Sequence, residues 1–108
     1  MGTDNDPGTQ SGQPAALNLS ISISPDVISQ EIQLGETLLL DVKTLAYFGL
    51  DELGTRFWAA MQQSADADDV MEIVASQTGQ STEHLAARFK AILKGMHQSR
   101  LIELKRSQ

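Results

Sequence analysis

The sequence predicts an α+β fold: a three-stranded antiparallel sheet followed by three helices, in a winged helix-turn-helix-like arrangement. The apolar pattern repeats about every two residues from Ser22 to Leu50 and about every 3.6 residues from Asp51 onward. Turn residues divide the first part into three short runs. Three residues that favour helix starts, Asp51, Asp66 and Ser81, precede the three helical runs. Strands are therefore expected first and helices after them.

The chain of 108 residues is long enough for one domain. Residues 1–20 are rich in Gly, Pro, Asp, Gln and Ser, and no large aliphatic side chain follows the initial Met before Leu17. Such a segment buries too little apolar surface to offset the entropy of ordering it. We expect a disordered N-terminal tail over 1–20, a folded domain over 21–105 and a C-terminal tail over 106–108.

Three strand segments follow one another in the first half. "SISPDVISQEIQL" places three apolar side chains on one side, and Gly35-Glu36 then predicts a type II′ hairpin with glycine first. "TLLLDV" returns with three apolar side chains on one face, and "DVKT", with Asp41, supplies the next turn. "LAYFGL" is the third strand. The two apolar sets are Ile28, Ile32 and Leu34, and Leu38, Leu40 and Val42.

The helices have recognisable ends. Asp51 caps "ELGTRFWAAMQQS", in whose first turn Gly54 predicts close contact with a neighbouring element. Asp66 caps the second helix, and Gly79 ends it. Ser81 caps the longest helix, which carries a single apolar stripe. The final "LIEL" is expected to pack back as a short extended piece.

Composition argues against several classes of function. There is no cysteine, and His84 and His97 are isolated, so no metal site is predicted. No Gly-rich phosphate loop is present, and the carboxylates are interpreted as helix-start and turn residues. We therefore predict no catalytic residue, no cofactor and no enzyme activity. Without a signal peptide or an apolar run of about 20 residues, a cytoplasmic location and no membrane contact are expected.

The winged helix-turn-helix layout raises DNA binding as an alternative from another class. Residues 83–108 carry six Lys or Arg against two Glu, a net +4, whereas residues 1–50 carry −5 and the chain as a whole −6. The exposed side of the recognition-helix candidate, 81–99, offers only Lys90, Lys94 and His84 for phosphate contacts. A sequence pI near 4.6 is also unlike that of a small DNA-binding domain, so nucleic acid is not the expected partner.

Peptide binding fits the third strand better. "LAYFGL" has no Lys, Pro or inward charge of the kind that protects an exposed strand edge. A partner peptide could therefore add a strand to it, with the third helix as the other wall of the groove. The alternative is that these apolar groups are simply core. The candidate peptide-binding residues are Ala46, Tyr47, Phe48, Gly49, Leu50, Leu85, Arg88, Phe89 and Ile92.

"LLLDVKTLAYFGLDELGTRFW", followed by "DDVMEIVA" and a last helix ending in "LIEL", resembles the PqqD-like family, also called RiPP recognition elements. The similarity runs from about Ser24 to Leu104. One departure lies before the tyrosine, where the family often has Thr-Gly-x-Tyr and this chain has Thr44-Leu45-Ala46-Tyr47, which indicates a turn of different shape. The family signature is matched by Tyr47, Phe48, Leu50, Asp51, Gly54 and Trp58.

The resemblance implies a non-catalytic chaperone. Such proteins capture the leader peptide of a ribosomally made precursor between the third strand and the third helix. They then present it to a maturation enzyme such as a radical SAM enzyme, a leader peptidase or a cyclase. We also expect a monomer or weak dimer, and the basic C-terminal part could steer an acidic leader. The alternative within the family is pyrroloquinoline quinone biosynthesis itself.

Overall fold

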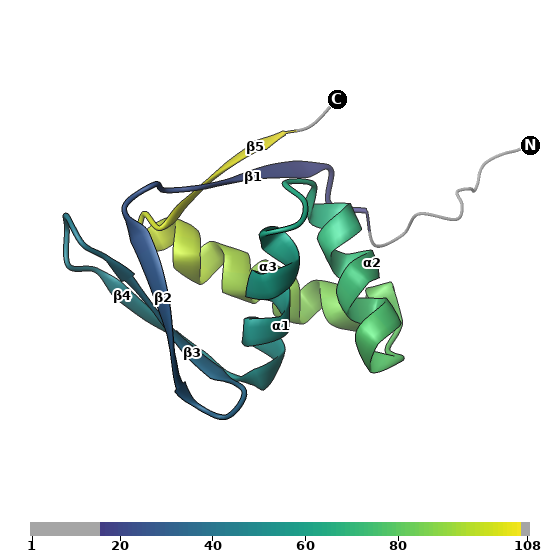
Figure 1. Cartoon of the computed structure of the whole chain (residues 1–108). Coiled ribbons are helices and arrows are strands. Elements are labelled where there is room, and N and C mark those ends of the chain that lie inside the picture. The colour runs from purple at the N-terminus through teal and green to yellow at the C-terminus, as the bar shows by residue number, and fades with distance from the viewer. Residues whose placement is uncertain (1–15, 107–108) are drawn as a thin grey trace, which may run out of the picture.

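The computed structural model describes residues 16–106 and has two antiparallel sheets and three helices (Figure 1). Strands β2, β3 and β4 form a meander in that order, and β1 pairs with β5 in a second sheet. The predicted three-stranded sheet followed by three helices is confirmed. The elements are β1 (Leu19–Ile23), β2 (Val27–Gln33), β3 (Glu36–Asp41), β4 (Tyr47–Leu50), α1 (Glu52–Met61), α2 (Ala67–Thr78), α3 (Thr82–Gln98) and β5 (Ile102–Arg106).

One core joins these elements. Figure 1 shows the meander at one end of the molecule, the helices toward the other, and the β1–β5 pair spanning the two along one side. Phe57 of α1 and Phe89 of α3 are fully buried and stack with ring centroids 4.4 Å apart. Leu39 and Leu50 enter the core from the meander, and Ile21 enters it from β1. The two sheets are thus held together through the helices.

The helix ends lie where the sequence predicts them. Asp51 Oδ1 accepts from the Gly54 N–H at 2.8 Å, and Ser81 Oγ accepts from the His84 N–H at 3.1 Å. Asp66 Oδ1 accepts from a first-turn amide of α2, and Gly79 ends that helix in the left-handed region at φ +75°. Gly54 is also buried, and a Cβ there would lie 3.0 Å from Leu50 Cδ2, which confirms the expected close contact.

The β2–β3 turn differs from the prediction. Its central residues are Leu34 and Gly35, and the positive φ of +79° falls at Gly35, the second of them. A type II′ turn needs positive φ at the first central residue, so the expected Gly35-Glu36 turn is wrong. An irregularity between Glu31 and Gln33 takes up one residue of β2, so that Gln33 pairs with Glu36 and only Leu34 and Gly35 lie between them.

The apolar sets of β2 and β3 do share a face, but it is the outer one. Leu39 is fully buried against the helices, whereas its neighbours Leu38 and Leu40 lie on the opposite, partly exposed face. The inner face also holds two buried polar residues. Thr37 accepts a hydrogen bond from Thr55 of α1 at 3.0 Å, and Asp41 binds turn amides. Two inner positions of β3 are thus polar, and several apolar side chains of the meander lie on its outer, solvent-exposed face.

The chain ends need a second correction. Residues 16–20, expected in the tail, belong to the fold: the Leu17 and Asn18 N–H groups donate to the Asp68 carboxylate at 2.7 and 3.0 Å, and β1 begins at Leu19. Its partner β5 contains the last three residues of the expected extended "LIEL" and continues to Arg106. The remaining parts of the two expected tails, residues 1–15 and 107–108, lie outside the described residues.

Candidate functional site

Strand β4 has one edge that no strand of residues 16–106 covers. Asp41 N–H donates to the Ala46 carbonyl at 2.9 Å, so Asp41 and Ala46 form a hydrogen-bonded pair. Such pairs alternate along an antiparallel ladder. The register then makes the pairs of Phe48 with Leu39 and of Leu50 with Thr37 the next hydrogen-bonded ones. The N–H and C=O groups of Tyr47 and Gly49 consequently point out to the free edge.

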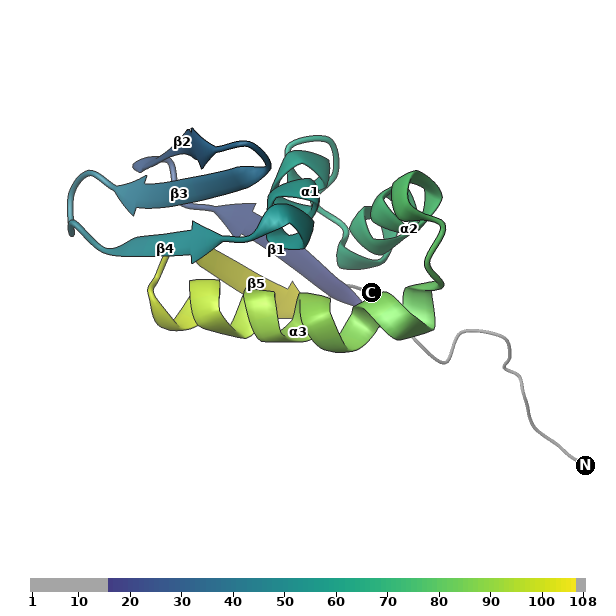
Figure 2. The ribbon, with the colours of Figure 1, turned by 90° about the horizontal axis from the view of Figure 1, so that it is seen from below.

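Helix α3 runs beside this edge in the opposite direction (Figure 2). Near one end Gly95 lies against the Phe48 ring, and near the other Arg88 Nη2 is 2.8 Å from Asp51 Oδ2. The three residues from Phe48 to Asp51 span about 10 Å of strand, and the seven from Arg88 to Gly95 span about 10.5 Å of helix. The matching lengths show that β4 and this part of α3 are aligned over that distance.

The predicted site residues divide into two groups. Tyr47, Gly49 and Arg88 are exposed, and Ala46, Phe48 and Ile92 are partly exposed. All six belong to β4, the residue before it, or α3. Leu85 and Phe89, by contrast, have no exposed surface, and Leu50 has 5%. Six of the nine predicted residues thus lie at the surface of β4 and α3, and the other three lie in the core behind them.

The sequence did not predict the roles of two residues in this region, Gly95 and Asp51. Gly95 is a mid-helix glycine, and a Cβ there would lie 2.7 Å from Phe48 Cε1 and 2.8 Å from Phe48 Cζ. The absence of a side chain thus allows β4 to approach α3. Asp51 is predictable as a helix cap but not as the partner of Arg88. Gly95 could have been identified from the sequence. A glycine inside a helix costs about 1 kcal/mol relative to alanine and therefore indicates a close contact at that position.

Asp51 serves both α1 and α3 with one carboxylate. Its Oδ1 accepts from the Gly54 N–H, while Oδ2 pairs with Arg88. The two side chains of the ion pair are 58% and 54% exposed, so the pair contributes at most about 1 kcal/mol. Arg88 can therefore leave Asp51 at low cost, and the cap of α1 does not depend on it.

The turn before β4 fixes where the free edge begins. The Asp41 carboxylate is buried and accepts from the N–H groups of Lys43 and Thr44 at 2.8 and 3.0 Å. Leu45 then adopts φ +64°, in the left-handed region that favours glycine. Leu45 stands at the glycine position of the Thr-Gly-x-Tyr pattern. Its backbone therefore has the conformation that a glycine would favour, although the side chain is leucine.

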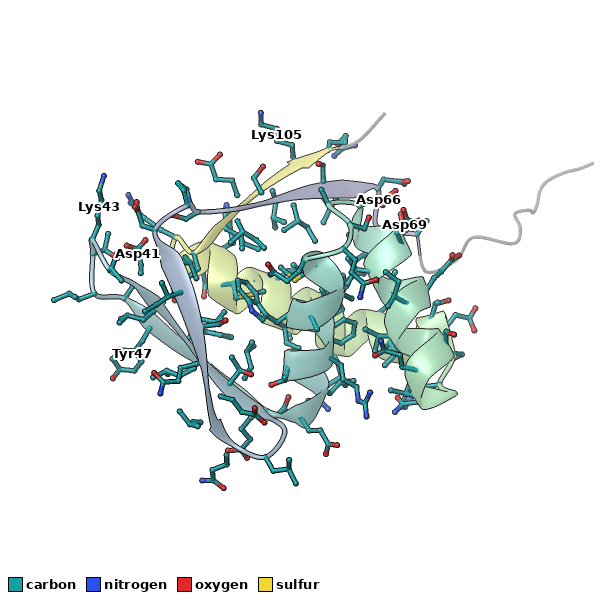
Figure 3. The ribbon with its side chains drawn as sticks, in the orientation of Figure 1. Asp41, Lys43, Tyr47, Asp66, Asp69 and Lys105 are labelled. Carbon is teal, nitrogen blue, oxygen red and sulfur yellow. The ribbon has the colours of Figure 1, made fainter. Side chains whose placement is uncertain are left out.

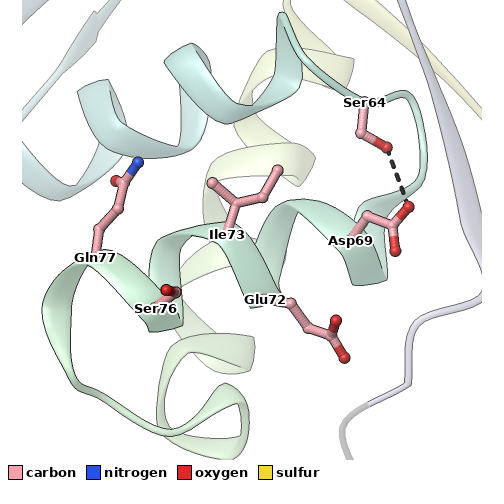
Figure 4. Close-up of a pocket in the computed structure, with 6 residues that line it drawn as sticks. All are labelled: Ser64, Asp69, Glu72, Ile73, Ser76 and Gln77. Carbon is pink, nitrogen blue, oxygen red and sulfur yellow. Dashed lines mark hydrogen bonds between the residues drawn. The ribbon is translucent and has the colours of Figure 1, made fainter.

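Hollows on the surface of the described residues lie away from the core. One, of about 830 Å³, adjoins the Arg88 end of the groove and is lined by Glu36, Asp51, Glu52, Leu53, Arg56, Gln77, Thr78, Gln80, His84 and Arg88. The other, of about 490 Å³, lies on α2 and the loop before it (Figure 4). There Ser64 Oγ donates to Asp69 Oδ2 at 3.4 Å. Within residues 16–106 no three His, Asp or Glu side chains are grouped to hold a metal ion.

Residues 36–102 match the family described as Coenzyme PQQ synthesis protein D (PqqD). The chain belongs to the PqqD family. The matched part of this PqqD-family chain begins with β3 and ends at the first residue of β5, so it contains the whole β4 edge and α3. The resemblance stated from the sequence is thereby confirmed. No curated protein matches this family member at a significant level.

A solved structure described as "TbiB1 in Complex with the TbiA(beta) Leader Peptide" is similar to this PqqD-family chain. The TM-score is 0.66 at 24% sequence identity, and the match covers 76% of this chain and 94% of the other. At that identity the likeness establishes the fold. Among residues 16–106 no helix combines the length and the apolar character needed to cross a bilayer.

Proposed function

We propose that this protein binds the leader peptide of a ribosomally made precursor as an added strand on β4, beside α3, and presents it to a maturation enzyme. The observation that carries the proposal is the free edge of β4, with the main-chain groups of Tyr47 and Gly49 directed outward along a helix. Strand addition to an exposed edge is a recurrent mode of peptide recognition. The protein itself contributes recognition and no chemistry.

Main-chain pairing alone is too weak to hold the guest. Tyr47 and Gly49 offer two N–H donors and two carbonyl acceptors, and each net hydrogen bond contributes roughly 0.5–1.5 kcal/mol. Part of that gain is offset by the ordering of a flexible peptide. Side chains on the α3 side must supply the rest. Phe48 and Ile92 are partly exposed there, so alternate guest residues that point inward should be apolar.

Arg88 gives the groove a charged end. Its pair with Asp51 is exposed and easily opened, because the second Asp51 oxygen keeps the α1 cap. A carboxylate on the guest can therefore take the place of Asp51 Oδ2 without unfolding the helix start. Residues 83–106, with a net charge of +4, would also attract an acidic leader, most strongly at low salt.

The comparisons support the same interpretation. The family match includes both walls of the groove, and the similar solved structure is described as a complex with a leader peptide. A radical SAM enzyme, a leader peptidase or a cyclase would be the receiving partner in a cytoplasmic modification pathway. A role in coenzyme PQQ synthesis is the second candidate, favoured by the description of the family. The two differ in which precursor peptide is bound.

A matched pair of variants at Gly49 tests the proposal. Gly49→Pro removes the outward N–H, while the bonds of Phe48 and Leu50 to β3 remain, and proline is tolerated at such an edge position. Gly49→Ala keeps the N–H, and its Cβ has no neighbour within 4 Å. The probe is a fluorescently labelled synthetic peptide with acidic residues and apolar residues at alternate positions, the leader chemistry argued above, and its anisotropy reports binding.

We expect Gly49→Ala to bind like the wild type and Gly49→Pro to bind about tenfold more weakly or worse. Arg88→Gln should weaken binding of an acidic leader less, and the loss should shrink with added salt. Substitution of His97, which is exposed on α3, should have little effect. Circular dichroism must show all variants folded. Equal affinities for the Pro and Ala variants would refute strand addition at β4.

A further inference from the structure

Five glycines lie within residues 16–106, and four of them have a clear structural role. Gly35 and Gly79 have φ angles of +79° and +75°, which favour glycine. Gly54 and Gly95 stand where any side chain would crowd a neighbouring residue. Neither reason applies to Gly49. Its backbone is regular strand, and apart from its two chain neighbours no described residue lies within 4 Å of the position that a Cβ would take. A glycine inside a strand often marks a place where another chain approaches closely.

The open space over Gly49 is bounded by apolar side chains on the outer face of the meander. Leu38 lies directly opposite Gly49 on β3, and Leu40 and Tyr47 form the pair two residues along. Alternate residues of a strand point to the same face, so these side chains lie on the face opposite to that of the buried Leu39. Tyr47 is 71% exposed and points away from the helices (Figure 3). The space, which we call the Gly49 gap, is open toward the free edge of β4.

The main chain of a guest strand would place one of its side chains at this gap. The N–H and C=O groups of Gly49 point to the free edge, so one residue of an antiparallel guest pairs directly with Gly49. The Cα atoms of such a pair are about 5.5 Å apart, and those of Gly49 and Leu38, a pair without mutual hydrogen bonds, are about 4.5 Å apart. The guest residue and Leu38 thus lie about 10 Å apart, on either side of the glycine. A large guest side chain can lean across the gap to Leu38, whereas that of alanine or serine is too short.

We propose that Gly49 is a specificity-determining residue, which admits a large apolar side chain, aromatic or as long as leucine, from the guest residue that pairs with it. The inference rests on the proposed function, since the added strand on β4 fixes where that guest residue lies. The walls of the gap, Leu38, Leu40 and Tyr47, are apolar apart from the tyrosine hydroxyl. Aromatic and aliphatic side chains on adjacent strands stabilise the pairing, and an aromatic side chain that lies over an edge glycine compensates for the missing side chain.

The guest is then recognised on both of its faces. Its inward residues contact Phe48 and Ile92, and one outward residue fills the Gly49 gap. The leader therefore has apolar residues at alternate positions and one further large apolar residue at an intervening position. Cross-strand contacts of this kind predict about fivefold tighter binding with phenylalanine than with alanine at that position.

A series of peptides, titrated with the full chain and followed by fluorescence anisotropy, tests this proposal. The parent is the labelled peptide that tests the proposed function, in which each acidic position in turn becomes alanine, leucine or phenylalanine. We expect one such position at which phenylalanine binds about fivefold more tightly than alanine, with leucine between them. Gly49→Val should abolish this preference, because its side chain occupies the gap while its N–H still pairs with the guest. With alanine at that position of the peptide, Gly49→Val should bind like the wild type.

Two further variants locate the effect at the gap. Leu38→Ala removes the wall opposite Gly49 and should lose part of the preference for phenylalanine. Ser22→Val is the matched control, because it adds the same side chain at an exposed position of β1, in the other sheet, and it should keep the full preference. Circular dichroism must show each variant folded.

The outcomes separate this inference from the proposed function. If the peptides bind but no acidic position prefers phenylalanine to alanine, the inference is overturned and leader binding stands. The same holds if the preference survives unchanged in both Gly49→Val and Leu38→Ala. If no peptide binds, or if Gly49→Pro binds as tightly as Gly49→Ala, the proposed function fails and this inference fails with it.

Discussion

The contact between Gly95 and Phe48 gives the sharpest stability prediction. An alanine Cβ at position 95 would lie 2.7 and 2.8 Å from two carbon atoms of the Phe48 ring, closer than such contacts occur. The ring must therefore move, and overpacking of this kind costs about 1–3 kcal/mol. Alanine also gains about 1 kcal/mol of helix propensity over glycine. In the wild-type background we expect Gly95→Ala to lower the free energy of unfolding by about 0–2 kcal/mol.

The same change should stabilise a chain that lacks the ring. In a Phe48→Ala background only the propensity term remains, so Gly95→Ala should raise the free energy of unfolding by about 1 kcal/mol. The coupling between the two sites is then about 1–3 kcal/mol. Urea unfolding followed by the fluorescence of Trp58, the single tryptophan, measures all four chains. Ala91→Gly at an exposed position of α3 calibrates the propensity term. Equal effects of Gly95→Ala in both backgrounds would refute the steric reasoning.

Three further changes follow from the turns. Leu45→Gly should leave stability unchanged or raise it by up to about 1 kcal/mol in urea unfolding, because glycine relieves the positive φ while little burial is lost; a clear loss would contradict the strain. Asp41→Ala should cost about 2–4 kcal/mol, because two turn amides lose a buried acceptor, and Asp41→Asn, which keeps an acceptor oxygen, should cost less; equal costs would contradict the role of that oxygen. Gly79→Ala should lower the melting temperature by the equivalent of about 1 kcal/mol, from its φ of +75° alone; no change would show that α2 ends differently.

Local signals made much of the fold predictable. Each of the three helix starts depends on one side chain and amides of the next turn, so Asp51, Asp66 and Ser81 could be identified directly. The apolar segment "LAYFGL" likewise indicated a strand with an unpaired edge, and one edge of β4 has no partner strand among residues 16–106. In these cases the interacting groups are close together in the sequence.

The sequence was less informative where distant residues meet. Leu38-Leu39-Leu40 is apolar on both faces, so alternation could not show that Leu39 alone is fully buried. Strand β1 pairs with β5 some eighty residues later, and neither strand has a neighbour in sequence that reveals the pairing. Arg88 and Asp51 are 37 positions apart. The open edge of β4 was therefore predictable from the sequence, whereas the contacts of α3 with β4 depend on residues that are far apart in the chain.

The pairing of β1 with β5 also determines how this domain can be joined to other proteins. Leu19 lies opposite Arg106, so the chain enters and leaves the described fold at one place, and Leu17 fixes that place next to the first turn of α2. In Figure 1 this point is far from β4. A reporter or an enzyme attached before residue 16 or after residue 106 would thus leave the guest edge of β4 open. Both ends are suitable attachment points for binding assays on a surface.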